Sequence, residues 1–552
     1  MAQLTEPLEL DEETAVMAVG TFWSNLGIIA VKLISFIYMI IIARLVAQSE
    51  VGLFYLGIGM VGVISIFADL GISQTVQRYL PYYLGKRDKV SASKVLTLNI
   101  VLGFVLLFIV AIAVFLLAPT IAGIYKTPGL APLLSLLAIY LCVNQTFNIL
   151  SNILIALKCM KERSIGTNVQ NTLKVVFTVI LVFTLGPSAM ALAAAFILSL
   201  IVGAFYLIYA LYDKLKRLEL PAVDLRGCYS LLLDILPFGI VMVSISTFSL
   251  LISYTGVLSL GYILGSASSV PVGIYSMATA FASVASILAA SVISILLPVA
   301  SGLVSKTDSS KIHKTAQTAL RWVLFSTIPI VAFLAAFAPS LLRVIYGADY
   351  ESGAISLALF SIGTLFYYIG SVQGTLIAAH RLVKLELIAF CCGALVNIAL
   401  NFMLIPGFGI NGAAFASLAA FAVIACINHY YAKREFGFVF PNSAWRNLLA
   451  GLIVFGALAA LQYAVYGYLL NLPLPLANGA LAGIVLDKIA KVAILGVFFA
   501  AGCLLYLALL NIMRLFEAED RQVMVHLLTK MKLPAQARAL ILSCIFWDKA
   551  KN

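Results

Sequence analysis

The chain has 552 residues, of which 63% are hydrophobic and 11% charged, and its formal net charge is +12 at pH 7. Soluble domains carry about 25% charged and 45–50% apolar residues, so this composition excludes an ordinary soluble enzyme, a disordered chain and a disulfide scaffold. The basic residues are scattered between apolar runs, so we expect no nucleic-acid partner. A membrane protein with many spanning helices fits, because one helix needs about 20 apolar residues.

Apolar runs broken by charged or Gly- and Pro-rich clusters predict the membrane-spanning helices. The expected fold is an all-α polytopic membrane protein with 14 transmembrane helices. The predicted spans cover residues 16–46, 51–79, 92–118, 130–157, 165–186, 189–212, 230–260, 270–300, 317–344, 353–378, 383–405, 411–432, 446–470 and 484–513.

The basic residues indicate the orientation. If the acidic N-terminus, residues 1–15, is cytoplasmic, 28 of the 35 Lys and Arg residues fall on cytoplasmic loops and the tail, against five on the other side. Cytoplasmic loops are enriched in Lys and Arg, so we expect both termini in the cytoplasm and the protein in the cell membrane. The N-terminus has no positive n-region and predicts no cleavable signal peptide. Residues 514–552 predict an amphipathic helix on the inner leaflet.

The second half of the chain repeats the first at a shift of about 220 residues. Residues 51–54, Val-Gly-Leu-Phe, correspond to residues 272–275, Val-Gly-Ile-Tyr. Six spans separate the copies, so both halves point the same way across the membrane. Two parallel six-helix repeats around a central cavity are an architecture of secondary transporters. The predicted parts are an N-lobe (16–212), a cytoplasmic inter-lobe loop (213–229), a C-lobe (230–432) and two extra helices (433–513).

Two charges lie at similar predicted depth in the first hairpin. Lys32 precedes the turn near Ser49 and Asp69 follows it, at roughly 25 and 30 Å along the two helices. A charge at the bilayer centre costs about 2.5–3.5 kcal/mol on insertion scales, so each is a functional hypothesis. Lys32 and Asp69 either pair and hold the two spans together, or Lys32 faces a water-filled cavity.

Polar side chains share helix faces with the buried lysines. Asn25 and Lys32 are seven residues apart, and Asn171 precedes Lys174 by three, so each pair lies on one face. These residues are candidates for substrate binding in a cavity.

An asparagine stripe lies on the fourth predicted span. Asn144, Asn148 and Asn152 follow one another at steps of four residues and are further candidates for substrate binding. Such a stripe can instead bond helix to helix, for about 0.6 kcal/mol per bond.

Cofactor and metal sites are not predicted. The eight cysteines show no Cys-x-x-Cys spacing, and His380 and His429 have no ligand partner at helical spacing. We expect the cysteines to pack as small apolar residues and these histidines to lie near the cytoplasmic interface.

Two short motifs carry a family resemblance. Residues 67–73, Phe-Ala-Asp-Leu-Gly-Ile-Ser, and residues 405–414, Ile-Pro-Gly-Phe-Gly-Ile-Asn-Gly-Ala-Ala, resemble those of polysaccharide transporter proteins. These are oligosaccharide flippases of the multidrug, oligosaccharidyl-lipid and polysaccharide exporter superfamily. The similarity runs from the first predicted span to the last.

The resemblance implies that the protein moves a polyprenyl (pyro)phosphate-linked oligosaccharide from the cytoplasmic to the outer leaflet by alternating access, for cell-surface polysaccharide or glycan assembly. Lys32 and Lys174 suit the phosphate, and the asparagines suit the sugars. In lipid II flippases the two extra helices form a groove for the lipid tail, which spans 13 and 14 are expected to reproduce. Membrane lipids are the other expected partners, and we expect a monomer.

The sequence departs from its relatives in the first span. It lacks the arginine cluster of lipid II flippases and the intramembrane acidic residue of many multidrug exporters. Asp69 is then the nearest candidate for coupling to H⁺ or Na⁺.

Two alternatives stay open. One is an ion-coupled multidrug or metabolite antiporter of the same superfamily, although fourteen spans instead of twelve count against it. The other is a membrane enzyme, such as a glycan polymerase, which would need acid or base residues on an outer loop. The predicted outer loops are short and nearly uncharged, so we expect no enzymatic activity.

Overall fold

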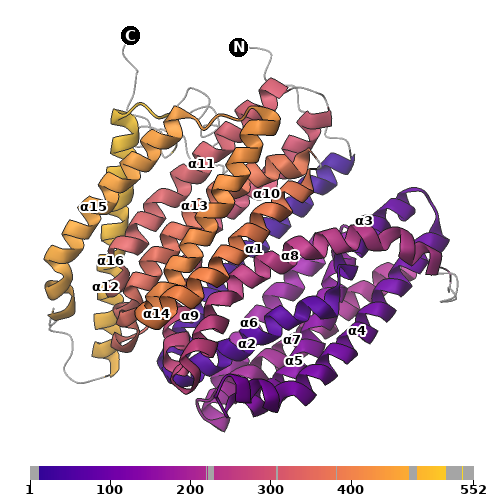
Figure 1. Cartoon of the computed structure of the whole chain (residues 1–552), viewed down its shortest axis with the longest axis horizontal. Coiled ribbons are helices and arrows are strands. Elements are labelled where there is room, and N and C mark those ends of the chain that lie inside the picture. The colour runs from indigo at the N-terminus through magenta and orange to yellow at the C-terminus, as the bar shows by residue number, and fades with distance from the viewer. Residues whose placement is uncertain are drawn as a thin grey trace. The chain divides into compact units, whose positions relative to one another are not determined.

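The structure is a computed structural model that describes residues 12–218, 221, 229–305, 309–380, 382–471, 481–516 and 538. Over these ranges every regular element is a helix, which confirms the all-α class expected from the sequence (Figure 1). Twelve helices in this part of the chain are long and apolar enough to cross a membrane. The protein is therefore a multi-pass membrane protein.

The count of fourteen spans stays a prediction. α14 (Val383–Phe436) contains the two predicted spans 383–405 and 411–432 and is counted once among the twelve. Gly409 interrupts it with a φ of 54° and a ψ of −129°, a conformation that glycine adopts readily. α1 (Glu12–Leu45) covers the first predicted span and is not among the twelve.

Three predicted spans are broken into two helices each. Pro339 explains one break, because proline begins a helix readily but lacks the N–H needed inside one. The broken spans give α2 (Gln48–Asp69) and α3 (Ile72–Gly85), α9 (Ser269–Ala282) and α10 (Ser286–Ser305) around the short helix η3 (Ser283–Ala285), and α11 (Ser309–Ala336) and α12 (Ala338–Ile345).

Contacts divide the described residues into two compact units. Unit 1 holds those up to Met277 together with Ala394–Ala416, and unit 2 holds Ala278–Gly393 together with those from Ser417 onward. This grouping does not follow the predicted lobes, because α8 (Tyr229–Leu264) packs on α2 within unit 1. The approach is close, since a Cβ at Gly62 of α2 would come within 2.6 Å of the Tyr254 ring of α8.

Unit 1 is built around the packing of α3, α4, α5 and α7. Figure 1 shows α3 lying beside α4, and buried apolar side chains such as Leu80, Phe147 and Leu207 join these helices. α7 runs on to Leu218, so residues 213–218 of the predicted inter-lobe loop are helical. The remaining helices of this unit are α4 (Lys89–Ile124), α5 (Leu130–Ala156), α6 (Met160–Leu185), α7 (Ala189–Leu218) and η2 (Gly265–Ala267).

The two copies of the repeated Val-Gly motif meet inside unit 1. A Cβ at Gly52 would lie 2.7 Å from the backbone nitrogen of Gly273, and a Cβ at Gly273 would lie 2.3 Å from the carbonyl oxygen of Gln48. Both positions therefore require glycine for backbone-to-backbone packing. The repeat is thus a structural contact as well as a sequence pattern.

Unit 2 is organised around α11, which packs against α10, α13 and α15. Polar side chains bond the two extra helices, α15 and α16, to α12 and α11. Gln462 of α15 donates to Ser340 of α12 at 2.7 Å, and the Tyr506 hydroxyl of α16 donates to the Leu324 carbonyl of α11 at 3.5 Å. The other elements of this unit are η4 (Ala348–Gly353), α13 (Ala354–Ala379), α15 (Asn442–Asn471) and α16 (Leu481–Ile512).

Three predicted segments lie mostly outside the described residues. They are the acidic N-terminus, the inter-lobe loop beyond Leu218 and the amphipathic tail after Phe516.

Candidate functional site

A break in the chain places Asp69 at the junction of α2 and α3. Leu70 and Gly71 both take positive φ angles, of 39° and 81°. Gly71 adopts this conformation without a steric penalty, whereas for Leu70 it costs roughly 1–2 kcal/mol. The two residues end α2 at Asp69 and start α3 at Ile72, so a carboxylate and the first turn of a new helix face each other.

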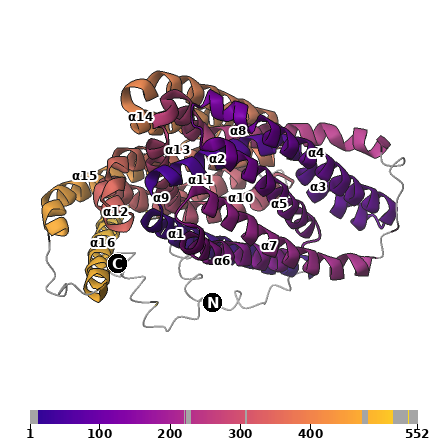
Figure 2. The same cartoon turned by 90° about the horizontal axis from the view of Figure 1, so that it is seen from below.

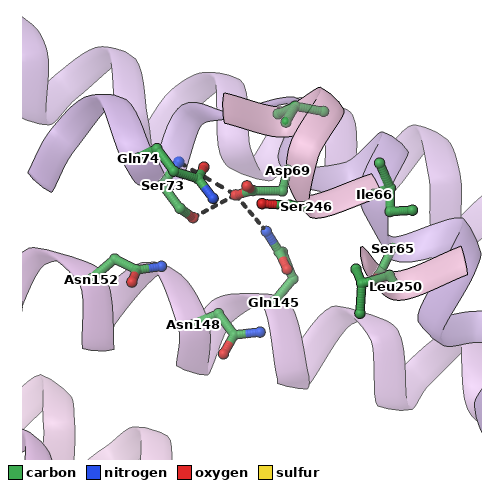
Figure 3. Close-up of a pocket in the computed structure, with 11 residues that line it drawn as sticks. Ser65, Ile66, Asp69, Ser73, Gln74, Gln145, Asn148, Asn152, Ser246 and Leu250 are labelled. Atoms are coloured by element: carbon green, nitrogen blue, oxygen red, sulfur yellow. Dashed lines mark hydrogen bonds between the residues drawn. The ribbon is translucent and has the colours of Figure 1, made fainter. Parts of the chain in front are cut away.

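One oxygen of the Asp69 carboxylate accepts several hydrogen bonds. Oδ1 accepts from the Ser73 amide at 3.3 Å, from the Ser73 hydroxyl and from Gln145 Nε2 at 3.2 Å (Figure 3). Hydrogen bonds to an ionised group are stronger than those between neutral groups. These bonds fix Asp69 against α3 and α5, and none of them involves its second carboxylate oxygen, Oδ2.

A cavity of about 200 Å³ opens beside Asp69. It is lined from four helices of unit 1, and Figure 3 shows Gln74 beside the carboxylate, with Asn148 and Asn152 farther away on α5. The Gln74 side-chain oxygen is buried with no hydrogen-bond donor among the described residues. The lining residues are Ser65, Ile66, Asp69, Ser73, Gln74, Gln145, Asn148, Asn152, Val243, Ser246 and Leu250. We call this cavity the Asp69 pocket.

The predicted asparagine stripe only partly lines the Asp69 pocket. Asn148 is exposed and Asn152 accepts from Gln77 Nε2 at 2.7 Å, and both line the cavity. Asn144, one turn earlier on α5, is half-buried and is not a lining residue. Asn148 and Asn152 therefore form part of the cavity wall, whereas Asn144 lies outside it.

Sequence reasoning missed several lining residues. Gln145 follows Asn144 directly and lies seven residues before Asn152, a spacing that places Gln145 and Asn152 on one helix face and is the signal that could have identified it. Ser73 belongs to the motif at residues 67–73, and Gln74 follows that motif directly. Ser246 on α8 carried no signal, because only the fold brings it to this place.

Lys174 and Asn171 lie together in a different part of unit 1. Both are 8% exposed on α6, and the Lys174 ammonium donates to Asn171 Oδ1 at 3.0 Å. The same ammonium lies 4.8 Å from the ring centroid of Tyr38 and 5.1 Å from that of Phe196, within range of cation–π attraction. We call this arrangement the Lys174 cage. Lys174 does not line the Asp69 pocket.

Lys32 is half-buried on α1, which packs against α6 (Figure 2). Within the described residues Lys32 and Asp69 form no ion pair, and Asp69 bonds to Ser73 and Gln145 instead. The side chain of Asn25 lies outside the described set. The sequence left two alternatives, an ion pair between Lys32 and Asp69 or a Lys32 that faces a cavity. The structure does not contain the ion pair.

Unit 2 holds a second polar cluster, which sequence reasoning did not single out. Glu386, in the first turn of α14, is half-buried, and a Cβ at Gly374 would lie 3.1 Å from its Oε1. Asn428 donates to the Gly370 carbonyl at 3.1 Å, and Gln373 bonds to His429 at 3.1 Å. Glu386 lies two residues after Lys384, so it resembles an ordinary interfacial charge in the sequence.

A metal centre is not formed by the described residues. Within these ranges no group of three or more His, Cys, Asp and Glu side chains is placed to hold a metal ion. The chemistry that the Asp69 pocket offers is hydrogen bonding through amides and hydroxyls, around a single carboxylate.

Comparison with known proteins places these features in context. Residues 17–304 match the family model described as polysaccharide biosynthesis protein. An uncharacterized membrane protein of Methanocaldococcus jannaschii is 23% identical over 451 residues, which cover 77% of this chain and 86% of that protein.

Two solved structures share the fold. The lipid II flippase MurJ in an inward closed conformation has a TM-score of 0.65 at 17% identity and covers 90% of this chain and 98% of its own. An inward-facing multidrug resistance transporter of the MATE family, in the MOP superfamily, has a TM-score of 0.59 at 18% identity and covers 74% and 94%. At these identities the likeness concerns the fold.

Proposed function

Since the chain belongs to the polysaccharide biosynthesis protein family, we propose that it is a flippase for a polyprenyl (pyro)phosphate-linked oligosaccharide. It moves this substrate from the cytoplasmic to the outer leaflet for assembly of a cell-surface polysaccharide or glycan. The observation that carries the proposal is the Asp69 pocket, which lies within the family-matched residues. Its amides, hydroxyls and carboxylate are the groups that hydrogen-bond to sugar hydroxyls.

Lys32 is the proposed partner of the substrate phosphate. It is half-buried on α1 and outside any ion pair with Asp69, so its charge is available to an anionic ligand. An ammonium is a suitable partner for phosphate, and a charge at membrane depth indicates function. Asn25 is expected on the same helix face as Lys32. For Lys174 and Asn171 we propose a supporting role, in which the enclosed ammonium holds α1, α6 and α7 together.

Transport is proposed to proceed by alternating access, driven by H⁺ or Na⁺. Two carboxylates of predicted spans, Asp69 and Glu386, are the candidates for coupling. The apolar exposed faces of α15 and α16 are proposed to hold the lipid tail, with residues such as Leu452 and Val497 in contact with it. We propose a monomer in the cell membrane with both termini in the cytoplasm.

The test uses the full-length protein in proteoliposomes with a fluorescent lipid-linked oligosaccharide. Wild type is expected to move the lipid between leaflets, and Lys32→Ala is expected to lose at least tenfold in rate while its melting temperature is unchanged. Lys216→Ala, which removes an exposed lysine near the end of α7, serves as the matched control. Absence of flipping by wild type, or wild-type flipping by Lys32→Ala, would contradict the respective part of the proposal.

An antiporter for cationic drugs or metabolites is the second candidate. The observation that favours it is the single carboxylate of the Asp69 pocket, combined with the fold shared with the MATE transporter. An antiporter would lower the accumulation of a cationic dye in energised vesicles and leave the lipid-linked sugar in place. A flippase gives the opposite pair of results in the same vesicles.

A further inference from the structure

We propose that the Asp69 pocket selects its glycan by charge: it accepts neutral or amine-bearing sugars and rejects sugars that carry a carboxylate. This inference rests on the proposed function and names the class of glycan that the site takes. It follows from the charge of the lining residues, from the acceptors that they leave open and from the place of the lysines.

The lining residues carry one charge, and it is negative. Seven of them are neutral and polar, Asp69 is ionisable, and neither Lys nor Arg is among them. The polar members other than Asp69 are Ser65, Ser73, Gln74, Gln145, Asn148, Asn152 and Ser246. An anionic sugar entering here meets a like charge, with no cation among the described lining residues to offset it.

Two acceptors beside the Asp69 carboxylate are open to a ligand. The bonds from Ser73 and Gln145 all end on Asp69 Oδ1, so the second carboxylate oxygen can accept from a ligand. The buried Gln74 oxygen also has no donor among the described residues. Sugar hydroxyls and ammonium groups supply such donors, whereas an ionised sugar carboxylate offers only acceptors.

The repulsion is large enough to sort substrates. Two like charges about 6 Å apart repel strongly where the effective dielectric constant is near 20, and the affinity falls by about tenfold or more. Like-charge opposition of this kind is a common means of rejecting a wrong ligand.

The phosphate of the substrate does not conflict with this preference. Lys32 lies on α1 and Lys174 is enclosed by Tyr38, Phe196 and Asn171, so neither lysine lines the Asp69 pocket. Unit 1 therefore separates its cations from its amide-rich carboxylate site. A substrate with an anionic phosphate and a neutral or cationic glycan matches this separation.

A bound inorganic cation is the competing occupant of the pocket. A cation needs several oxygens directed toward it, but Asp69 Oδ1 is already surrounded by N–H and O–H donors from Ser73 and Gln145. The geometry thus favours a ligand that donates hydrogen bonds, and of the two proposed coupling ions it leaves H⁺ rather than Na⁺ for Asp69. Cation competition is retained as an outcome of the test.

Three soluble trisaccharides of equal length test the inference. They are triglucosamine, which is cationic at pH 6.5, neutral tri-N-acetylglucosamine and anionic trigalacturonate. Their dissociation constants are measured by calorimetry on the full-length protein in nanodiscs of neutral lipid, at constant ionic strength. Wild type is expected to bind the first two at least tenfold more tightly than trigalacturonate.

Two variants tie the preference to the pocket. Asp69→Asn keeps the shape and removes the charge, and should bring trigalacturonate within about threefold of the neutral trisaccharide. Asp213→Asn, which neutralises an exposed carboxylate of α7, should keep the wild-type order.

The inference is overturned by equal wild-type affinities, by an order that Asp69→Asn leaves unchanged, or by no binding of any trisaccharide. It is also overturned if replacing choline chloride with NaCl displaces the neutral trisaccharide in wild type but not in Asp69→Asn, because the pocket would then hold a cation. The proteoliposome assay with Lys32→Ala decides the proposed function separately. If wild type flips the lipid but binds the three trisaccharides with equal affinity, the selection of the glycan by charge is rejected and the proposed flippase function is not.

Discussion

Unit 1 holds two charges in opposite ways. Asp69 lies beside a cavity, with one carboxylate oxygen bonded to Ser73 and Gln145 and the other outside that set. Lys174 is enclosed, with its ammonium on Asn171 and against the faces of Tyr38 and Phe196. Both charges lie in an apolar helix bundle, but only Asp69 keeps an atom, its second carboxylate oxygen, that can bond to a ligand in a cavity. Burial of a charge alone therefore does not mark a binding site.

The largest expected effect comes from reversing the enclosed charge. Lys174→Glu places a carboxylate against two negatively polarised ring faces and the Asn171 oxygen, with no cation among its described contacts. An uncompensated buried charge costs about 3–5 kcal/mol. We expect this variant to melt far below wild type in detergent, while Lys488→Glu on the exposed face of α16 melts normally.

Lys174→Met separates a structural role from a substrate role. Methionine fills a similar volume without the charge, and replacing a buried charge by an apolar group is often neutral for stability. We expect near-wild-type melting and flipping. A stable Lys174→Met protein that no longer flips its lipid would place Lys174 in the substrate path and end the contrast between the two sites.

Removing the Asp69 carboxylate is expected to affect transport more than stability. Asp69→Ala leaves the Ser73 and Gln145 donors unpaired, which costs about 1–3 kcal/mol of folding free energy. It also removes the acceptor offered to the glycan, so we expect flipping to fall at least tenfold. Melting curves and proteoliposome rates on the same preparation separate the two effects.

The asparagine stripe defines the edge of the Asp69 pocket. Asn148 lines the cavity and Asn144 does not, although both lie on α5 one turn apart. One lost hydrogen bond is worth about 0.5–1.5 kcal/mol, so Asn148→Ala should slow flipping about three- to tenfold. Asn144→Ala should stay within about twofold of wild type, and equal losses in the two variants would show that the whole stripe contacts substrate.

A carboxylate at the start of α4 gives the smallest effect and a reference for the other two charges. Asp88 caps α4, and hydrogen bonds from Ser91 lower the pKa of its carboxyl below the ordinary range. A lowered folded-state pKa stabilises the protein above the unfolded-state pKa, and the effect is lost as pH falls through the folded-state value. Asp88→Ala should lower the melting temperature slightly at pH 7, by an amount that shrinks toward pH 3. A constant difference would contradict the capping role.

Sequence reasoning predicted the fold class because apolar runs and basic loops report directly on the bilayer. It did not predict the breaks at Leu70 and at Ser283, since each depends on local backbone geometry inside an otherwise apolar run. For the break before Ala338 the sequence does hold a signal, Pro339. The position of α8 beside α2 was also hidden, because glycines such as Gly62 do not indicate which side chain they will contact.

Prediction of the site was uneven for a related reason. Asp69, Asn148 and Asn152 were candidates because charges and stripes of amides stand out in an apolar sequence. Gln145 joined them only when α5 packed against the α2–α3 junction. Lys174 stood out equally, yet its neighbours Tyr38 and Phe196 come from two other helices, α1 and α7, whose packing on α6 sequence periodicity cannot determine.

The central claim is that the glycan of a lipid-linked substrate enters the Asp69 pocket. The most direct measurement places a photo-crosslinking amino acid at Asn148 and, separately, at Phe183, which is 75% exposed on α6. Each protein is irradiated in proteoliposomes with a lipid-linked oligosaccharide labelled in its sugar. We predict capture of the label at position 148 and not at position 183. Capture only at position 183, or equal capture at both, would contradict the account.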